Sequence, residues 1–292
     1  MISGENGNGP TAVIAGFGDI GGRVARRLVQ RGWQVTAIIR TPQKRIAAEC
    51  SSAVPRTLDL DHPEDIGDAD ILFWFAPPRA EGVRDERLRA FLDAQRGRIG
   101  RVVYISTSGV YGDCAGRWID EDEPLNPQTD RARRRADAEY ALADWSRRSA
   151  AEIVVLRVPG IYGPGRLPRQ RLERGLPVLR PDQSPCSNRI HADDLAAVAV
   201  LAAERGGAGR AYNVADGNPT TMADYFLRCA RLLGLPPPRE LDLDAARREL
   251  SAAMWSFIEE SKRLRIDRAR DELGFAPRYP DLESGLPSCL EP

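Results

Sequence analysis

The chain has 292 residues, a formal net charge of zero, and 42% hydrophobic and 29% charged residues. This length permits one large domain or two modest ones, and the apolar content supports a sizeable core. The balanced charge gives no bulk electrostatic case for nucleic acid or an acidic membrane as a partner. No apolar run approaches the roughly 20 residues of a membrane helix, so we expect a cytoplasmic protein that binds no membrane.

Cysteine usage and the first residues add further limits. The cysteines are scattered, odd in number and without a Cys-x-x-Cys pair. This pattern argues against a disulfide framework and against a metal site. Residues 1–10 are polar and glycine-rich, and we expect them to form a flexible tail.

The first predicted elements are a strand, a glycine-rich turn, a helix and a second strand. Thr11–Ala15 is apolar and partly β-branched, as expected for a strand buried on both faces. The helix that follows has apolar residues at helical spacing with arginines between them, and Gly32 ends it. Residues 33–39 form the second apolar strand. In this order of elements, a Gly-x-Gly-x-x-Gly turn indicates dinucleotide binding.

The glycine turn predicts how a dinucleotide is held. Gly16 permits a tight turn, Gly18 lets the backbone approach a pyrophosphate, and Gly21 lets the helix pack closely on the strand. The N–H groups at the helix start receive the phosphate charge, so Asp19 and Ile20 are also assigned to the cofactor site. The alternative interpretation is a purely structural glycine turn.

The end of the second strand indicates which dinucleotide binds. Sites for NAD usually place an Asp or Glu here to hold the ribose hydroxyls, whereas this chain has Ile39 and Arg40. A guanidinium matches a 2′-phosphate in charge and in its forked donors. The sequence therefore favours NADP over NAD, with a solvated basic turn as the alternative.

Strands and helices continue to alternate, which implies a parallel, doubly wound α/β sheet, the Rossmann fold. We predict strands at 56–60, 69–76, 101–105, 153–158 and 211–214, and helices at 84–96, 130–148, 192–205 and 221–233. Strand ends on one side of such a sheet line the cofactor crevice, which adds Asp59, Ala76 and Pro77. Residues 241–273 read as helical and highly charged, and the chain after Tyr279 reads as loosely held.

Four stretches together resemble the extended short-chain dehydrogenase/reductase family, the epimerase/dehydratase-like group. They are Gly16–Gly21, VYISTSGVYG (103–112), LRVPGIYGPGR (156–166) and RIHADDLA (189–196). The resemblance implies a nicotinamide cofactor, a small-molecule substrate and a homodimer through two helices. It also implies a smaller, mostly helical C-terminal lobe that binds the substrate.

The resemblance also assigns catalytic positions, and two of them depart from the family pattern. Thr107, with Ser108 beside it, matches the residue that hydrogen-bonds the substrate oxygen. The tyrosine and lysine of the Tyr-x-x-x-Lys pair are replaced by Arg131 and Arg135. Arg135 can bind the nicotinamide ribose, but Arg131 is a poor proton donor because its pKa lies above about 12. Arg131 can instead stabilise an oxyanion, and Tyr111 is the best substitute acid, with simple packing as the equal alternative.

The remaining site residues follow from the same resemblance. Pro159 is assigned to the cofactor, and Tyr162, Arg166 and Arg189 to the substrate. Arginines in this region suggest an anionic substrate, with solvated surface arginines as the alternative. For Cys114 an inert packing role, and for His191 helix capping, is favoured over catalysis.

These predictions combine into one hypothesis with one rival. Residues 11–163 and 186–216 form the dinucleotide-binding domain, and 164–185 and 217–292 form the substrate lobe. The chain is an atypical NADP-dependent oxidoreductase or epimerase/dehydratase-like enzyme that acts on a small anionic carbonyl or alcohol. The rival is a catalytically silent NADP-binding sensor or partner-binding protein.

Overall fold

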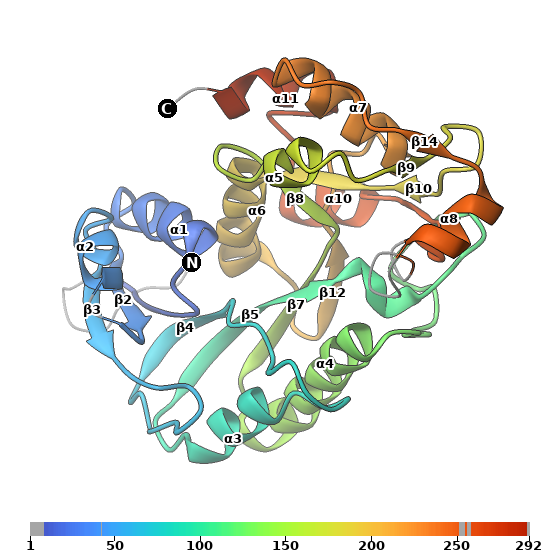
Figure 1. The fold of residues 1–292 in the computed structure, drawn as a ribbon. Coiled ribbons are helices and arrows are strands. Elements are labelled where there is room, and N and C mark those ends of the chain that lie inside the picture. Colours follow the sequence, from blue (N-terminus) through green and yellow to red (C-terminus); the bar gives the residue numbers. More distant parts are fainter. Residues whose placement is uncertain (1–8, 42, 251–254, 256–257, 291–292) are drawn as a thin grey trace.

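A seven-stranded parallel sheet forms the centre of the protein (Figure 1). The computed structural model describes residues 9–41, 43–250, 255 and 258–290, so the predicted tail lies almost entirely outside the described residues. The strand order is β12-β7-β5-β4-β1-β2-β3. The chain leaves β1 in one direction for β2 and β3 and returns on the other side for β4, as in a Rossmann fold. The predicted fold class is confirmed.

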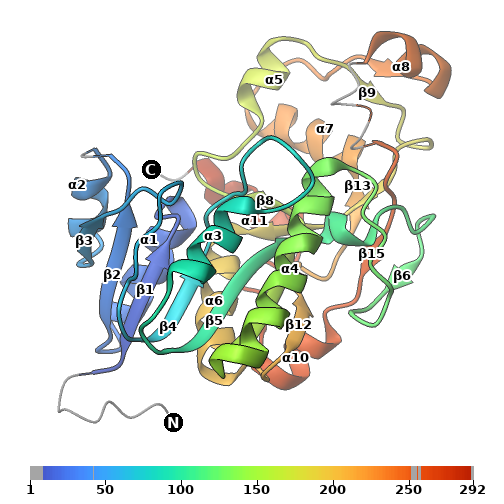
Figure 2. The ribbon, with the colours of Figure 1, turned by 90° about the horizontal axis from the view of Figure 1, so that it is seen from below.

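Apolar runs become the strands and amphipathic segments become the helices that cover them. The strands of the central sheet are β1 (Thr11–Ala15), β2 (Gln34–Ile39), β3 (Val54–Thr57), β4 (Ala69–Trp74), β5 (Ile99–Thr107), β7 (Glu152–Val158) and β12 (Arg210–Asn213). Helices α1 (Asp19–Val29), α2 (Gln43–Glu49), α6 (Ala192–Arg205) and α10 (Asp267–Leu273) lie on one face. Helices α3 (Glu86–Ala94) and α4 (Asp130–Ser149) cover the other face (Figure 2).

The side chains of the inner strands contribute to the hydrophobic layers on both faces of the sheet. In β1, Ala12 and Ile14 belong to the cluster under α1 and α6, whereas Val13 and Ala15 belong to the cluster under α3 and α4. Successive strand residues point to opposite faces. Burial on both faces is therefore the reason that these strands read as continuous apolar runs rather than as alternating ones.

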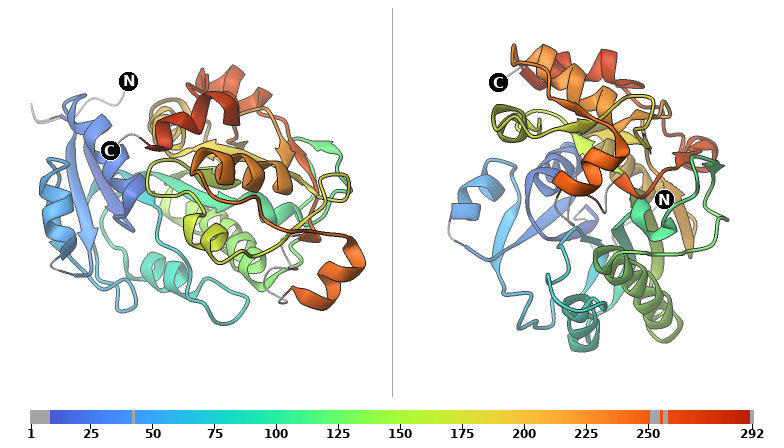
Figure 3. Two further views of the ribbon diagram at one scale, coloured as in Figure 1. Left: turned by 45° about the horizontal axis from the view of Figure 1, so that its top comes forward. Right: turned by 45° about the vertical axis from the view of Figure 1, so that its right-hand side comes forward.

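A smaller layer lies over the carboxyl ends of the strands, at the top of Figure 1 and in front in the left view of Figure 3. Its helices are α5 (Arg169–Glu173), α7 (Met222–Leu232), α8 (Leu243–Glu249) and α11 (Leu282–Gly285). Its two-stranded pairs are β8 (Gly160–Tyr162) with β11 (Arg189–His191), β9 (Val178–Leu179) with β14 (Glu240–Leu241), and β10 (Cys186–Ser187) with β13 (Thr220–Thr221). The exact domain boundaries stay a prediction. Helix α10, which falls within the predicted lobe, packs against α6 and against β12 of the central sheet.

The C-terminal quarter corrects two expectations. Residues 241–273 are not one helix, because β15 (Arg263–Leu264) pairs with β6 (Trp118–Ile119) between α8 and α10. Local helix propensity is a weak prior that such tertiary pairing overrides. The chain after Tyr279 is not loosely held, because α11 and the 3₁₀ turn η2 (Pro287–Leu290) pack in an apolar cluster with Tyr162. Among the described helices, none has the length and apolar composition needed to cross a bilayer.

Candidate functional site

Three hollows join into one crevice along the carboxyl ends of the central strands. The glycine-turn hollow has a volume of about 350 Å³ and holds Gly16, Gly18, Arg40 and Asp59. The middle hollow, of about 400 Å³, lies at the ends of β4, β5 and β7. The lobe pocket, of about 480 Å³, lies between Thr107 and the smaller layer. Pro77 lines the first two hollows, and Thr107, Arg131 and Pro159 line the last two.

The glycine turn has the shape that a pyrophosphate requires. Gly16 has a φ of +88°, and a Cβ there would lie 2.3 Å from the backbone nitrogen of Ala76. A Cβ on Gly21 would lie 3.2 Å from Ile14 Cγ2, whereas one on Gly18 would meet nothing within 4 Å. Gly18 also precedes α1 without any side-chain cap. The turn therefore leaves open space directly in front of the N–H groups that can hold a phosphate.

The start of α1 carries an ion pair across the crevice. Asp19 bonds Arg23 within the helix, and the Nε of Arg166 lies 2.6 Å from its Oδ2. Burial raises the pKa of Asp19, but the hydrogen bonds from Arg166 and Arg23 outweigh it and hold the pKa below its usual value. Arg166 thus lies at the glycine turn. Its predicted substrate role would place it in the lobe pocket, but it does not line that pocket. Ile20 is buried beneath this turn.

The far end of the glycine-turn hollow holds the residues that meet an adenosine ribose in a Rossmann fold. Arg40 is exposed at the end of β2 and Asp59 follows β3, and both line the hollow. Arg87 of α3 also lines it, and its guanidinium bonds both carboxylate oxygens of Asp61 and the carbonyl of Pro77. Sequence reasoning missed Arg87, although its place at the start of a helix that follows a crevice strand was the available signal.

Thr107 stands at the end of β5, where the chain turns into the 3₁₀ turn η1 (Ser108–Tyr111). Its Oγ1 accepts a hydrogen bond of 3.2 Å from the N–H of Gly109 and so caps this turn. A hydroxyl also has a proton to donate, and within the described chain no acceptor takes that proton. Thr107 and Ser108 both line the lobe pocket, so Thr107 is poised to donate to a ligand oxygen.

The two arginines that replace the Tyr-x-x-x-Lys pair both face the crevice from α4. Arg135 lines the middle hollow, and its Nη1 donates to the carbonyl of Ile105 at 2.9 Å and to the hydroxyl of Tyr104 at 3.3 Å. Arg131, one helical turn earlier, lines both the middle hollow and the lobe pocket. Desolvation lowers the pKa of Arg131, while the Glu260 carboxylate opposes that decrease.

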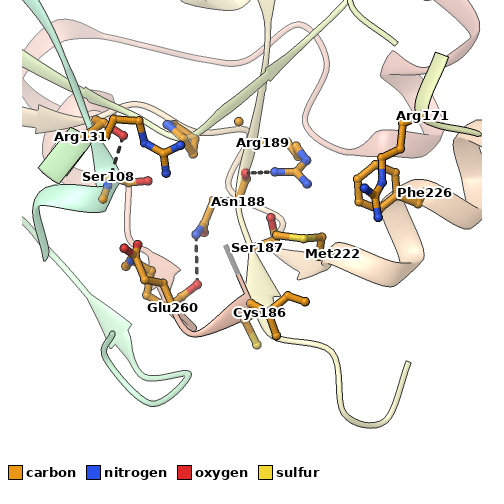
Figure 4. Close-up of a pocket in the computed structure, with 16 residues that line it drawn as sticks. Ser108, Arg131, Arg171, Cys186, Ser187, Asn188, Arg189, Met222, Phe226 and Glu260 are labelled. Atoms are coloured by element: carbon orange, nitrogen blue, oxygen red, sulfur yellow. Dashed lines mark hydrogen bonds and ion pairs between the residues drawn. The ribbon is translucent and has the colours of Figure 1, made fainter. Parts of the chain in front are cut away.

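Figure 4 shows the lobe pocket, to which Arg131, Arg171, Arg189 and Glu260 contribute charged side chains. Arg189 of β11 donates to the Asn188 carbonyl at 3.1 Å, and its guanidinium carbon lies 4.3 Å from the centre of the Tyr225 ring. Its Nε is buried and has no hydrogen-bond partner among the described residues. Burial lowers the pKa of this guanidinium.

Comparisons with known proteins agree with this fold and show the family of the chain. The model of the NAD dependent epimerase/dehydratase family matches residues 87–215. Protein YeeZ of Escherichia coli is 31% identical over 283 residues, which cover 92% of this chain and 96% of YeeZ. The chain belongs to the NAD-dependent epimerase/dehydratase family. Membership of this family makes the chain an NAD(P)-binding, oxidoreductase-like protein. The name of YeeZ states no activity.

Solved structures extend the comparison. A functionally unknown conserved protein from Silicibacter pomeroyi is 32% identical, with a TM-score of 0.79 over 96% of this chain and 98% of that one. A UDP-glucuronic acid 4-epimerase from Bacillus cereus, solved with NAD, is 18% identical, with a TM-score of 0.75 over 95% of this chain and 96% of that one. The second likeness shows a shared fold.

Two tyrosines that were predicted for the site lie outside the crevice. Tyr111 is only 1% exposed, and its hydroxyl donates to Asn213 Oδ1 at 2.8 Å and accepts from Arg157 Nη1 at 2.9 Å. Burial raises the pKa of Tyr111. The turn η1 directs this side chain into the core while Thr107 faces the pocket, so Tyr111 is not placed to act as the substitute acid.

Tyr162 is likewise fully buried, and its hydroxyl donates to the carbonyl of Asp281 at 3.3 Å. Burial raises the pKa of Tyr162. Its ring packs against His191, which caps α6 by accepting a hydrogen bond from the N–H of Asp193. Tyr162 therefore holds the C-terminal segment in place and makes no contact with the lobe pocket.

Sequence reasoning missed most of the residues that line the lobe pocket, and three of these have polar or charged side chains near Thr107 in the structure. Asn188, Glu260 and Lys262 all line this pocket, and the last two come from a segment that was expected to be helical. Lys44 and Lys262 are the only lysines in the chain. A lysine in a chain that otherwise uses arginine was the available signal, but nothing in the sequence placed Lys262 beside Thr107.

Proposed function

We propose that this chain is an NADP-dependent oxidoreductase or epimerase/dehydratase-like enzyme that acts on a small anionic alcohol or carbonyl compound. The observation that carries the proposal is the buried Nε of Arg189, which lacks a partner among the described residues and belongs to a side chain that lines the lobe pocket. A buried cation is costly unless an anion or an acceptor pairs with it. A carboxylate or phosphate of the substrate would supply that partner.

The remaining charge in the lobe pocket supports an anionic ligand. Arg131, Arg171, Arg189 and Lys262 line it, against the single carboxylate of Glu260 among the described lining residues. The planar fork of a guanidinium can hold a carboxylate or phosphate with two parallel hydrogen bonds. The wall is partly apolar, with Met222 and Phe226 of α7, so a ligand with a nonpolar body and an anionic group fits best.

The preference for NADP rests on the end of β2. Arg40 is exposed at the rim of the glycine-turn hollow and makes no ion pair with any residue that the structure describes. The carboxylate of Asp59 accepts a local hydrogen bond from the N–H of Asp61. A 2′-phosphate at this rim would find the Arg40 guanidinium available.

The residues of the crevice divide the work of such a reaction. A bound nicotinamide would supply the hydride chemistry. Arg135 lines the middle hollow, where it would bind the nicotinamide ribose, and Thr107 would donate a hydrogen bond to the substrate oxygen. Arg131 would stabilise negative charge that develops on that oxygen, because its guanidinium stays protonated near neutrality.

A second candidate function is a catalytically silent NADP-binding sensor. The arginines at positions 131 and 135 favour it, since they replace the usual proton donor and its partner. We also infer a cytoplasmic location, and a homodimer through α3 and α4, where Tyr140 is 57% exposed.

One set of measurements separates the candidates. Calorimetry with NADPH and NADH tests cofactor binding, and the loaded protein is then screened for turnover with alcohols and carbonyls that include UDP-glucuronic acid and UDP-glucose. An enzyme turns over at least one member, and the substitution Arg189→Gln raises its KM at least tenfold for the anionic substrate. The exposed Arg265→Gln serves as the matched control. NADPH binding without any turnover favours the sensor, and no binding of either cofactor defeats both.

A further inference from the structure

The segment between α8 and α10 contributes a buried ion pair, Glu260 with Lys262, to the wall of the lobe pocket. The Nζ of Lys262 lies 2.8 Å from Oε2 of Glu260, and the two side chains are 6% and 13% exposed. Both residues line the lobe pocket together with Thr107 and Arg131. Glu260 and Lys262 thus share a pocket with Arg131, which occupies the position of the family's tyrosine on α4.

Ser261, which lies between the pair, fixes both residues in position. Its N–H donates to Asp113 Oδ1 at 2.8 Å, and its carbonyl accepts from the N–H groups of Cys114 and Gly116 at 3.1 and 2.9 Å. Its hydroxyl accepts from the N–H of Cys186 at 3.0 Å. The pair is therefore attached both to the loop that continues from Thr107 and to the smaller layer.

Asn188 adds a second attachment from inside the pocket. Its side-chain amide donates to the carbonyl of Lys262 at 3.0 Å and accepts from the N–H of Leu264 at 2.9 Å. Figure 4 shows Asn188 pointing toward the Glu260 segment, with a dashed line for the first of these bonds. A backbone held from both sides gives the positional precision that proton transfer requires.

The pair also has unused hydrogen-bonding capacity. Oε1 of Glu260 is buried and has no hydrogen-bond partner within the described chain. An unmatched buried carboxylate oxygen is unfavourable unless a donor arrives. A substrate hydroxyl in the lobe pocket would be such a donor. The other charged or titratable side chains that line this pocket are Arg131 of α4, Arg171 of α5, Cys186 of β10 and Arg189 of β11. Glu260 interacts electrostatically with Arg131, and Lys262 with the thiol of Cys114 after η1.

We propose that Glu260 and Lys262 form the proton-transfer site of the lobe pocket and replace the acid–base pair that α4 lacks. The proposal rests on the function proposed above. In the oxidation direction, the substrate O–H bond breaks and its proton joins Oε1 of Glu260. The electron pair of the adjacent C–H bond would leave as hydride, for which a bound oxidised nicotinamide would be the acceptor, and the substrate carbon would become a carbonyl. Lys262 keeps its proton and holds the carboxylate in place, and the reduction runs the same steps in reverse.

The test compares Glu260→Gln with Glu259→Gln, its exposed neighbour outside the pocket, on whichever substrate the panel identifies. Removing a general base costs about 10²- to 10⁴-fold in kcat, and we expect a loss in that range for Glu260→Gln alone. NADPH affinity should stay within about twofold in both variants. The acid limb of the wild-type pH–kcat profile should vanish in Glu260→Gln. Lys262→Arg should retain more activity than Lys262→Met, because Arg preserves the charge beside the carboxylate.

A second measurement, chemical labelling of Lys262, tests the ion pair without requiring turnover. Trinitrobenzenesulfonate reacts with uncharged amines, and peptide mass spectrometry can follow Lys262 with Lys44 as the internal reference. Glu260→Gln should speed labelling of Lys262 at least threefold, because the ammonium loses its partner, and UDP-glucuronic acid with NADP should slow it. The NADPH affinity of each variant, expected to stay within about twofold of the wild type, is the folding control.

The outcomes separate this inference from the proposed function. A wild-type enzyme with turnover that survives in Glu260→Gln overturns the proton-transfer role and leaves the enzyme intact. Unchanged Lys262 labelling in Glu260→Gln overturns the pair itself. Cofactor binding with no turnover of any panel member defeats the enzyme and this role together.

Discussion

The two ends of the crevice are built in different ways. The glycine-turn hollow is lined by residues at or shortly after the carboxyl ends of β1, β2, β3 and β4, together with Arg87 at the start of α3. The lobe pocket instead gathers residues from β5, α4, α5, β10, β11, α7 and the segment after α8. The glycine-turn hollow is thus formed by the ends of neighbouring strands, whereas the lobe pocket is formed by segments that lie far apart in the sequence. A substitution in the glycine-turn hollow should therefore affect only its immediate surroundings, whereas one in the lobe pocket should affect contacts between distant segments.

The largest effect is expected in the glycine turn, through Gly16→Ala and Gly18→Ala. At Gly16 the positive φ and the contact with the backbone of Ala76 should lower the free energy of unfolding by about 3 kcal/mol or more. At Gly18 a methyl group meets open space, so the cost should be about 1 kcal/mol or less. Both variants should lose NADPH affinity at least tenfold in calorimetry. Equal stability losses would contradict the geometry of this turn.

The second prediction concerns the pH dependence of stability at the lobe end. Burial raises the pKa of Asp216 to about 7, against smaller opposing effects from the Asn218 N–H and Arg189. The folded state therefore keeps a proton that the unfolded chain releases above its ordinary pKa near 3.8. Stability should fall as pH rises from about 4 to about 7, by on the order of 4 kcal/mol, and then level off.

Asp216→Asn should remove this dependence, because the amide keeps the oxygen that accepts from the Asn218 N–H. Chemical denaturation at several pH values measures it, with Asp182→Asn on the surface as the control. Parallel stability curves for the wild type and Asp216→Asn would show that the carboxyl titrates normally in the folded protein.

The third prediction separates cofactors at the rim of the glycine-turn hollow. Arg40→Asp should weaken NADPH binding at least tenfold, because a carboxylate would then face the 2′-phosphate, and should change NADH binding little. Arg45→Asp is the control, since Arg45 pairs with Glu49 within its own helix. Equal losses for the two cofactors would refute a 2′-phosphate contact.

The smallest effect on activity is expected at Tyr111. Because its hydroxyl is buried between Asn213 and Arg157, Tyr111→Phe should destabilise the fold by about 1–3 kcal/mol. At a temperature where the variant is folded, kcat should stay within about twofold of the wild type. Thermal unfolding and initial rates measure the two effects. A large loss of kcat at full folding would return Tyr111 to the catalytic set.

The sequence by itself determined the sheet and the edge at which the glycine turn lies. Gly16, Gly18 and Arg40 could be placed at that edge because each follows a strand, and parallel strands bring such ends to one side of the sheet. The resemblance added Thr107, Arg131 and Arg135, which share the crevice in the structure.

Only the tertiary structure decided which side chains face the lobe pocket. Tyr111 is near Thr107 in sequence, yet η1 directs its side chain into the core. Lys262 is far from Thr107 in sequence, yet the contacts of Ser261 and Asn188 place it in the same pocket. The physical reason is that long-range hydrogen bonds and burial, rather than local spacing, set the direction of side chains where distant segments meet.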